Sequence, residues 1–237
     1  MITEELVKIM NIDSTSGKEV ELARYIADNC HVPGAILEIQ DVGDGSINLF
    51  YRWGKPEIIF CTHLDTVPPY IAPVTGIGEV SGRGACDAKG QIITALNVCR
   101  DLFNEGETNF GLLLVSGEET GSKGAKVANN LVKGCKYVII GEPTENKLIK
   151  AGKGIQLYDV QIRGVSCHSG YPQLGDDAIN RMRQFLNRLA AADFPSDPVL
   201  GPTTFNIGQL SSDNAYNVLP DLVSFKIYFR TTPASSD

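Results

Sequence analysis

The sequence has only three histidines and lacks paired cysteines. Its six cysteines, at positions 30, 61, 86, 99, 135 and 167, form no Cys-x-x-Cys pair, which disfavours a zinc finger or a disulfide framework. The formal charge of −7 disfavours nucleic acid or an anionic membrane as a partner. No apolar run approaches the length of a membrane span, and the acidic start Met1–Glu5 lacks the basic residues of a signal peptide. We therefore expect a cytoplasmic, globular protein.

Uncharged strand-like segments that end in histidine or acidic residues occur three times in the first 150 residues. They are Ile58–Thr62 with His63 and Asp65, Gly111–Ser116 with Glu118 and Glu119, and Tyr137–Ile140 with Glu142. Their uncharged composition predicts buried strands. Because ligands gather at the carboxyl ends of strands in open α/β sheets, we expect these side chains to share one sheet edge.

Asp87 precedes a helical pattern that starts at Gln91 and ends at Gly106. Two interpretations are open for this carboxylate. It could cap the helix amino terminus, where the helix dipole favours an acid, or it could join the side chains at the sheet edge.

Three further features complete the amino-terminal part. Ser16–Glu19 has the Ser-x-x-Glu form of a capping box, and the apolar spacing after it predicts a helix ending near Asn29. The segments Leu37–Gln40 and Ile47–Tyr51, separated by a Gly-Asp-Gly turn, predict a hairpin at a sheet edge. A helix is expected over 122–132.

The pattern changes near Gly152, so we predict two domains, residues 1–153 and 154–237. The second part has an alternating strand, a Gly/Ser loop holding His168, an amphipathic helix and two antiparallel strands with one solvated face. In order, these elements are Ile155–Arg163, 164–172, Asp177–Ala191, Thr204–Gln209 and Leu222–Phe229. The fold class is therefore α/β, with a layered main domain and a smaller α+β unit.

One imidazole and five carboxylates at a single sheet edge repel one another unless cations are present. A pair of divalent ions removes this repulsion. Mixed imidazole and carboxylate ligands suit Zn²⁺, with Co²⁺ or Mn²⁺ as substitutes, and one carboxylate can bridge two ions. We expect Asp65 to orient the ring of His63 from behind.

The sequence resembles the M20 family of zinc metallopeptidases, which includes acetylornithine deacetylase, succinyl-diaminopimelate desuccinylase and glutamate carboxypeptidases. The resemblance rests on six segments in the family's order: Thr62–Pro68, Ser81–Gly90, Gly117–Gly121, Gly141–Thr144, Gly164–Pro172 with His168, and Asn217–Pro220. It implies a three-layer zinc-hydrolase domain carrying a smaller ferredoxin-like lid that forms a homodimer.

The resemblance also implies roles for individual residues. His63 and Glu142 are similar to the terminal ligands of one zinc, Asp87 to the bridging carboxylate, Glu119 to a ligand of the second zinc, Glu118 to the general base, and Asp65 to the residue behind the histidine ligand. His168 is similar to a lid histidine that reaches the substrate carbonyl, and Asn217 to a substrate contact. The implied reaction is attack on an amide by water that two zinc ions activate and Glu118 deprotonates. We expect N-acyl amino acid deacylation, with a carboxypeptidase or dipeptidase as the alternative.

The chain departs from the family pattern in its histidines. They lie only at positions 31, 63 and 168, whereas the family's second zinc also takes a histidine from a later segment. The chain ends inside the implied lid. Either it is a truncated form of the hydrolase, or it is a short form that serves as a non-catalytic dimerising or binding module. The retention of Glu118 favours truncation, and we expect weak or no activity from this chain alone.

Other classes of protein find less support. A cysteine hydrolase is suggested by Cys167 beside His168 and by Cys61 near His63, but catalytic pairs of this kind usually come from distant positions. A nucleotide-binding loop fails at both glycine-rich candidates, because Ser81 replaces the last glycine of one and Gly154 the Ser/Thr of the other.

Overall fold

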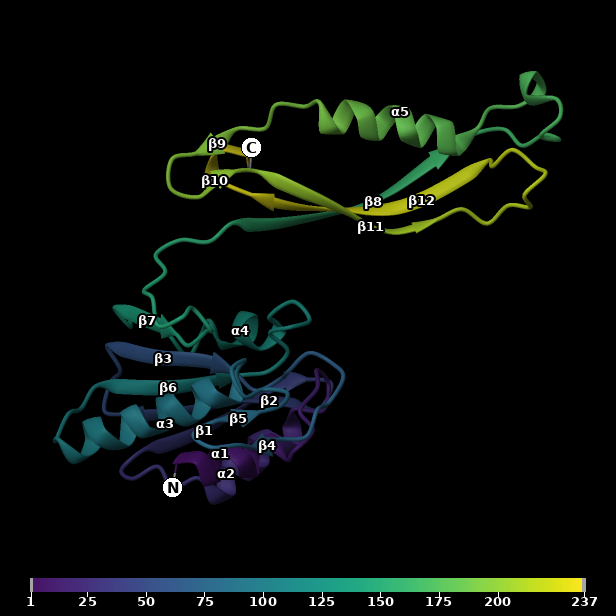
Figure 1. The fold of residues 1–237 in the computed structure, drawn as a ribbon. Helices are drawn as coiled ribbons and strands as arrows, with labels where there is room; N and C mark the ends of the chain where they lie inside the picture. Colours follow the sequence, from purple (N-terminus) through teal and green to yellow (C-terminus); the bar gives the residue numbers. More distant parts are fainter. Residues whose placement is uncertain (1, 236–237) are drawn as a thin grey trace. The chain divides into compact units, whose positions relative to one another are not determined.

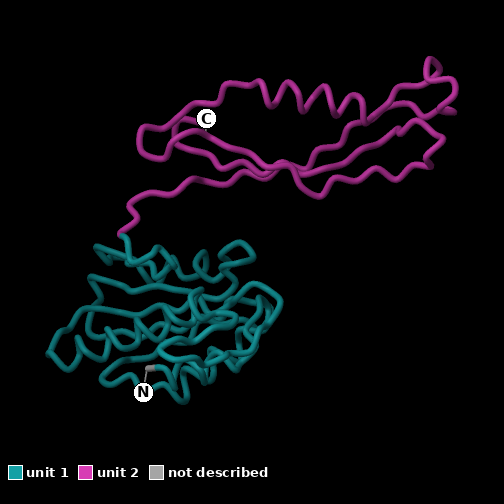
Figure 2. The backbone as a smooth tube through the Cα atoms, in the orientation of Figure 1, with its two compact units in different colours: residues 1–147 teal, residues 148–237 magenta. Residues whose placement is uncertain are grey.

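The computed structural model describes residues 2–235, which divide into two compact units (Figures 1 and 2). Unit 1 comprises the residues up to Lys147, and unit 2 begins at Leu148, a few residues before the position 154 expected from the sequence. No helix in the part of the chain that the structure describes is long and apolar enough to cross a membrane.

Unit 1 is built on a five-stranded sheet in the order β1-β2-β6-β3-β7. The strands are β1 Ile36–Gly43, β2 Ser46–Trp53, β3 Ile58–His63, β6 Phe110–Val115 and β7 Tyr137–Ile140. β3 runs parallel to both β6 and β7, whereas β2 is antiparallel to β1 and β6. The parallel strands β3, β6 and β7, which precede the histidine and the acids, thus have their carboxyl ends at the same end of the sheet, as predicted. The β1–β2 hairpin forms the side of the sheet opposite β7.

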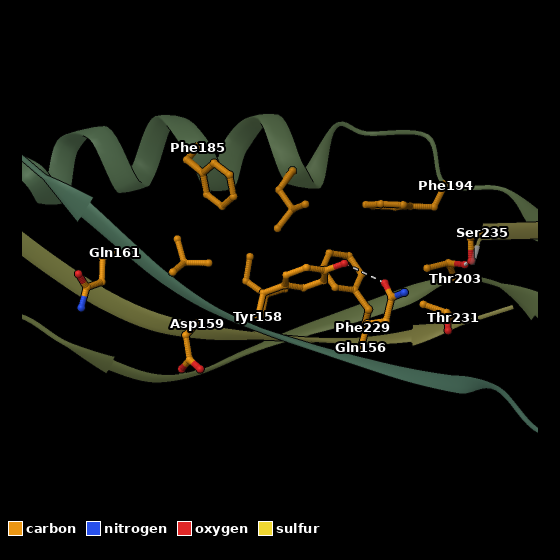
Figure 3. Close-up of a pocket in the computed structure, with 13 residues that line it drawn as sticks. Gln156, Tyr158, Asp159, Gln161, Phe185, Phe194, Thr203, Phe229, Thr231 and Ser235 are labelled. Carbon is orange, nitrogen blue, oxygen red and sulfur yellow. Dashed lines mark hydrogen bonds between the residues drawn. The ribbon is translucent and has the colours of Figure 1, made fainter. Parts of the chain in front are cut away.

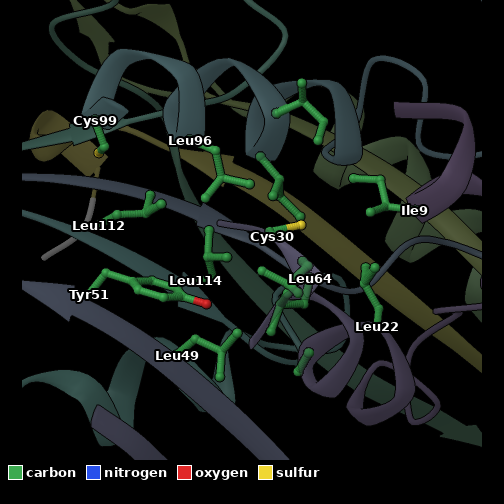
Figure 4. Packing of buried hydrophobic residues seen from close by; sticks show 14 of the residues in the cluster. Ile9, Leu22, Cys30, Leu49, Tyr51, Leu64, Leu96, Cys99, Leu112 and Leu114 are labelled. Carbon is green, nitrogen blue, oxygen red and sulfur yellow. The ribbon is translucent and has the colours of Figure 1, made fainter. Parts of the chain in front are cut away.

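Side chains of β2 and β6 alternate between two apolar cores, which produces three layers. On one face, Leu49, Leu112 and Leu114 pack against helices α1, α2 and α3 (Figure 4). On the other face, Phe50 and Leu113 pack against α4. These helices are α1 Ile2–Met10, α2 Val20–Asn29, α3 Lys89–Asn104 and α4 Lys123–Ala128. Burial on both faces explains why β6 is apolar without interruption.

Helix α1 was not predicted from the sequence. Its Leu6 and Ile9 pack into the core beside α2 and α3, and their spacing could have indicated a helix. Helix α4 is shorter than the predicted 122–132, and the chain continues in turns from Asn129. Two consecutive asparagines, Asn129 and Asn130, explain this end because asparagine is a weak helix former.

Strand β7 differs from the prediction of a buried strand, because all four of its residues are exposed. It pairs with β3 alone among the described residues and forms the end of the sheet. An edge position leaves side chains on both faces with fewer neighbours than in β3 or β6. Two short strands, β4 Val74–Thr75 and β5 Val80–Ser81, form a separate hairpin before α3.

Unit 2 has a three-stranded antiparallel sheet in the order β11-β12-β8, with α5 packed on one face. Its elements are β8 Gly154–Arg163, η1 Pro172–Leu174, α5 Ala178–Ala190, β9 Ser196–Asp197, β10 Gly201–Pro202, β11 Thr204–Ser211, β12 Leu222–Thr231 and η2 Pro233–Ser235. Val223, Phe225 and Ile227 of the central strand are buried beneath α5. This confirms the predicted helix over antiparallel strands.

Candidate metal centre

The carboxyl edge of the sheet brings one histidine and four acidic residues together. His63 ends β3, Glu118 and Glu119 follow β6, and Glu142 follows β7. Asp87 comes from the loop before α3, and its Oδ1 lies 2.9 Å from His63 Nε2. Glu142 Oε1 lies 3.8 Å from the same nitrogen.

Two overlapping triads at this edge have the donor atoms of a metal site. They are His63 with Glu118 and Glu119, and His63 with Asp87 and Glu142, and within each triad the potential ligand atoms lie within 4.8 Å of one another. One imidazole nitrogen with carboxylate oxygens is a donor set for Zn²⁺, Co²⁺ or Mn²⁺. His63 and these four acids, which the sequence predicts at one sheet edge, therefore lie close together there.

The ring of His63 is buried and oriented by Asp65. Its Nδ1 lies 2.8 Å from the backbone carbonyl oxygen of Asp65 and 3.6 Å from the Asp65 carboxylate. In the neutral ring with a proton on Nδ1, that nitrogen donates to the carbonyl, and the lone pair of Nε2 faces the acids. The close contact between Asp65 and His63 is thus through the Asp65 backbone carbonyl, and the expected role of the carboxylate in orienting the ring stays a prediction.

The Asp65 carboxylate is fully buried and organises the loop after β6. It accepts hydrogen bonds from the backbone amides of Glu118 at 2.9 Å and Glu119 at 3.2 Å, and from Ser16 Oγ at 2.8 Å. Burial acts to raise the pKa of Asp65, but its contacts with His63, Glu118 and Ser16 outweigh that effect and lower it. No pattern in the sequence predicted that Ser16 belongs to this site.

The charges at the sheet edge are unbalanced in the protein alone. Burial raises the pKa of Glu119 and of Glu142, and the neighbouring carboxylates Asp87 and Glu118 raise both further. Burial would lower the pKa of His63, yet Asp65 and Glu142 outweigh it and raise that pKa to about 9. Each of these carboxylates disfavours the ionised form of its neighbours. A divalent cation bound among them, beside the buried imidazole, would offset this repulsion.

Asp87 does not cap α3. The helix begins at Lys89 with Ala88 as its N-cap residue, and no side chain makes a capping hydrogen bond there. Asp87 instead directs its carboxylate toward His63, which supports the metal-ligand interpretation. Lys89 is buried, and its Nζ donates to the carbonyl of Ile12 at 2.6 Å.

His168 and Asn217 lie side by side within unit 2. The backbone of His168 forms an isolated bridge with Val218, and the amide of Ser169 donates to the Asn217 carbonyl at 2.9 Å. Both side chains are exposed, and His168 Nδ1 accepts the amide of Gly170 at 3.0 Å. Their implied contacts with substrate stay a prediction.

The cysteines do not form a nucleophile–base pair in the structure. Cys167 Sγ donates to the backbone carbonyls of His168 and Tyr171 rather than to an imidazole. Burial raises the pKa of Cys61 to about 12, so its thiol stays protonated at neutral pH. These contacts disfavour a cysteine hydrolase.

A cavity of about 580 Å³ lies in unit 2, between α5 and the sheet (Figure 3). Its walls include Phe185, Phe194 and Phe229, and its titratable side chains are Tyr158 and Asp159. The Asp159 carboxylate faces Lys226 Nζ at 3.2 Å. No histidine, cysteine or cluster of acids is among the described residues that line this cavity.

The fold and site together define an α/β protein with an acid-rich candidate metal centre at the carboxyl edge of its sheet. Residues 151–237 match the family model described as the peptidase dimerisation domain. A peptidase M20 domain-containing protein of Schizosaccharomyces pombe is 33% identical over 94% of this chain. A probable carboxypeptidase of Aspergillus clavatus is 31% identical over 90% of it. Nearly the whole chain is thus similar to peptidases of the M20 family.

Solved structures share the fold at lower identity. A tripeptidase of Staphylococcus aureus superposes with a TM-score of 0.80 at 21% identity, over 98% of this chain and 66% of that one. A dinuclear metal-binding M20 peptidase of Bacillus subtilis gives a TM-score of 0.63 at 15% identity, over 97% of this chain and 63% of that one. The chain spans 58% of the length of each of the two sequence relatives named above.

Proposed function

We propose that this chain is part of a metal-dependent hydrolase that cleaves an amide bond in a small peptide or N-acyl amino acid. The observation that carries the proposal is the approach of Asp87 and Glu142 to Nε2 of the buried His63. A cluster of acids around an imidazole at the carboxyl ends of parallel strands is costly unless a cation neutralises it.

The residues that would hold divalent metal are His63, Asp87, Glu119 and Glu142. Metal bound in such a site polarises a carbonyl and makes water more acidic. Glu118 is only partly buried, so its carboxylate is free to take a proton from water at the site and to return it to the leaving amine. Asp65 and the backbone around it keep His63 Nε2 directed at the acids.

The substrate class follows from the relatives rather than from the site. The Aspergillus clavatus relative is described as a probable carboxypeptidase and the Staphylococcus aureus structure as a tripeptidase. These names favour a peptidase over the expected N-acyl amino acid deacylase. We therefore propose short peptides as the first substrates to test, with N-acetyl amino acids as the alternative.

The test combines metal binding with hydrolysis. We expect the chelator-treated chain to bind Zn²⁺ in isothermal titration, and any hydrolysis of dipeptides or tripeptides to be lost on metal removal and to return with metal. Glu118→Gln should abolish turnover while Glu145→Gln, an exposed acid paired with Lys147, leaves it unchanged. Turnover that survives chelation would refute the proposal.

A non-catalytic dimerising module is the second candidate, because unit 2 matches a dimerisation domain and unit 1 supplies one histidine to the site. Sedimentation together with Zn²⁺ titration of the chain distinguishes the two. A dimer that binds no Zn²⁺ and turns over no peptide or N-acyl amino acid would favour the module.

A further inference from the structure

The segment between α1 and α2 lies directly beside the Asp65 end of β3. The Thr66 amide donates to the Ser14 carbonyl at 3.0 Å, and the Ser16 amide donates to the Thr66 carbonyl at 3.0 Å. Thr15 and Thr66 form a parallel β-bridge. This pairing places the Ser16 hydroxyl 2.8 Å from Asp65 Oδ2.

We infer that Ser16 is a positioning residue of the metal centre, acting through the Asp65 carboxylate. The inference rests on the proposed function. Asp65 Oδ1 accepts the Glu118 amide and is the carboxylate oxygen 3.6 Å from His63 Nδ1, whereas Oδ2 accepts the Glu119 amide and the Ser16 hydroxyl. Ser16 thereby fixes the Asp65 carboxylate, which holds the loop carrying Glu118 and Glu119 and lies beside the ring of His63.

The loop around Ser16 is itself firmly anchored, which lets the hydroxyl act as a fixed donor. The fully buried Glu19 carboxylate accepts the Gly17 amide at 2.6 Å and the Ser46 hydroxyl at 3.1 Å. At the other end, Lys89 Nζ holds the Ile12 carbonyl. Lys89 follows Asp87 by two residues. The loop between α1 and α2 therefore contacts both Asp65, through Ser16, and the segment that carries Asp87, through Ile12.

Removal of the Ser16 hydroxyl leaves the buried Asp65 Oδ2 with the Glu119 amide as its remaining hydrogen-bond donor among the described residues. A buried carboxylate that loses a donor can shift to recover one, and the Glu118–Glu119 loop shifts with it. Loss of a partner one shell behind the ligands typically weakens metal affinity by about 10- to 100-fold. We expect the weakening without a comparable change in the thermal unfolding of the metal-free chain.

The same loop offers a matched control. Ser14 is fully buried two residues away, and its hydroxyl has no hydrogen-bond partner within residues 2–235. Ser14→Ala therefore removes a buried hydroxyl from the same segment without touching Asp65. Ser16→Thr and Ser16→Val form a second pair, equal in shape and different in the hydroxyl alone.

The experiment is isothermal titration of the full metal-free chain and its variants with Zn²⁺. We expect Ser16→Ala to weaken Zn²⁺ binding about tenfold or more, with Ser16→Thr and Ser14→Ala within about twofold of the natural chain. If Ser16→Ala does not fold, Ser16→Val must bind at least about tenfold more weakly than Ser16→Thr.

Equal Zn²⁺ affinities for the natural chain and Ser16→Ala, or for the Thr and Val variants, would overturn the role of Ser16 and leave the metal centre intact. Failure of the natural chain itself to bind Zn²⁺ would instead reject the proposed function and, with it, the inference that rests on it.

Discussion

His63 and the acids around it depend on a few short contacts at the ends of three strands. Burial holds the ring in place, the Asp65 carbonyl occupies Nδ1, and the acids face Nε2. His63, Asp65 and the acids therefore make different contacts, and single substitutions can test the contribution of each residue.

Glu119 and Glu118 are neighbours with different expected roles. We expect Glu119→Gln, which removes a charged ligand, to weaken Zn²⁺ binding by more than the about 10- to 100-fold that loss of a residue behind the ligands causes, and Glu118→Gln to weaken it by less than about tenfold, below that range. Equilibrium dialysis of both variants measures the difference. Equal losses would mean that both carboxylates bind metal.

The stability of the metal-free chain should fall as pH rises through the titration of His63. The folded-state pKa of His63 is raised to about 9 from its ordinary value of 6.5, so the folded state binds more protons between these pH values. The stabilisation present below this window is lost above it. At about 1.4 kcal/mol per pKa unit, the loss is up to about 3 kcal/mol. The raised pKa values of Glu119 and Glu142 act in the same direction.

Urea unfolding of the metal-free chain at pH 6 and pH 9 tests this pH dependence. His63→Gln should flatten it, and His31→Gln, at an exposed loop position, should not. A free energy of unfolding that rises between these pH values would contradict the assigned environment of His63.

The histidine and acids at the strand ends could be predicted because parallel strands bring their carboxyl ends to one edge. Ser16 could not, since it lies on no strand end and no sequence pattern links it to Asp65, 49 positions away. The Ser-x-x-Glu pattern also suggested a capping box that the structure does not contain. Glu19 is the N-cap residue of α2, makes no capping bond and uses its carboxylate for Gly17 and Ser46.

At the scale of elements, β6 and α3 hold the site in place. β6 is buried along its whole length, and α3 covers it through Ile92, Leu96 and Cys99. Periodicity predicted both elements because their burial is regular. The exposure of β7 could not be read from its four apolar residues, since composition does not tell a central strand from an edge strand.

Leu96 tests the contribution of α3 to stability. We expect Leu96→Ala to lower the free energy of unfolding by about 2–5 kcal/mol, because the side chain is fully buried against the sheet. Val98→Ala, on the same helix and 36% exposed, should cost less than about 1 kcal/mol. Chemical denaturation followed by circular dichroism measures both. Similar losses of stability in the two variants would mean that Leu96 contributes no more than Val98 to the packing of α3 against the sheet.

At the scale of the whole molecule, each unit has its own apolar core, and residues 148–153 contain no helix or strand. We expect trypsin to cut first after the exposed Lys150 and to leave two folded fragments. Mass spectrometry identifies the cut, and circular dichroism of the separated fragments reports their folding. Lys150→Gln should slow that cleavage, whereas earlier cuts inside either unit would argue against independent cores.

Strand β7 has a consequence for how the protein behaves at high concentration. It presents Tyr137, Val138, Ile139 and Ile140 together with a backbone edge that pairs with no other strand among the described residues. Such an edge is a template for adding strands from other molecules, and the charges of Lys136 and Glu142 near the ends of the strand oppose that growth. The purified chain should therefore tend to polymerise at high concentration unless another protein surface covers β7.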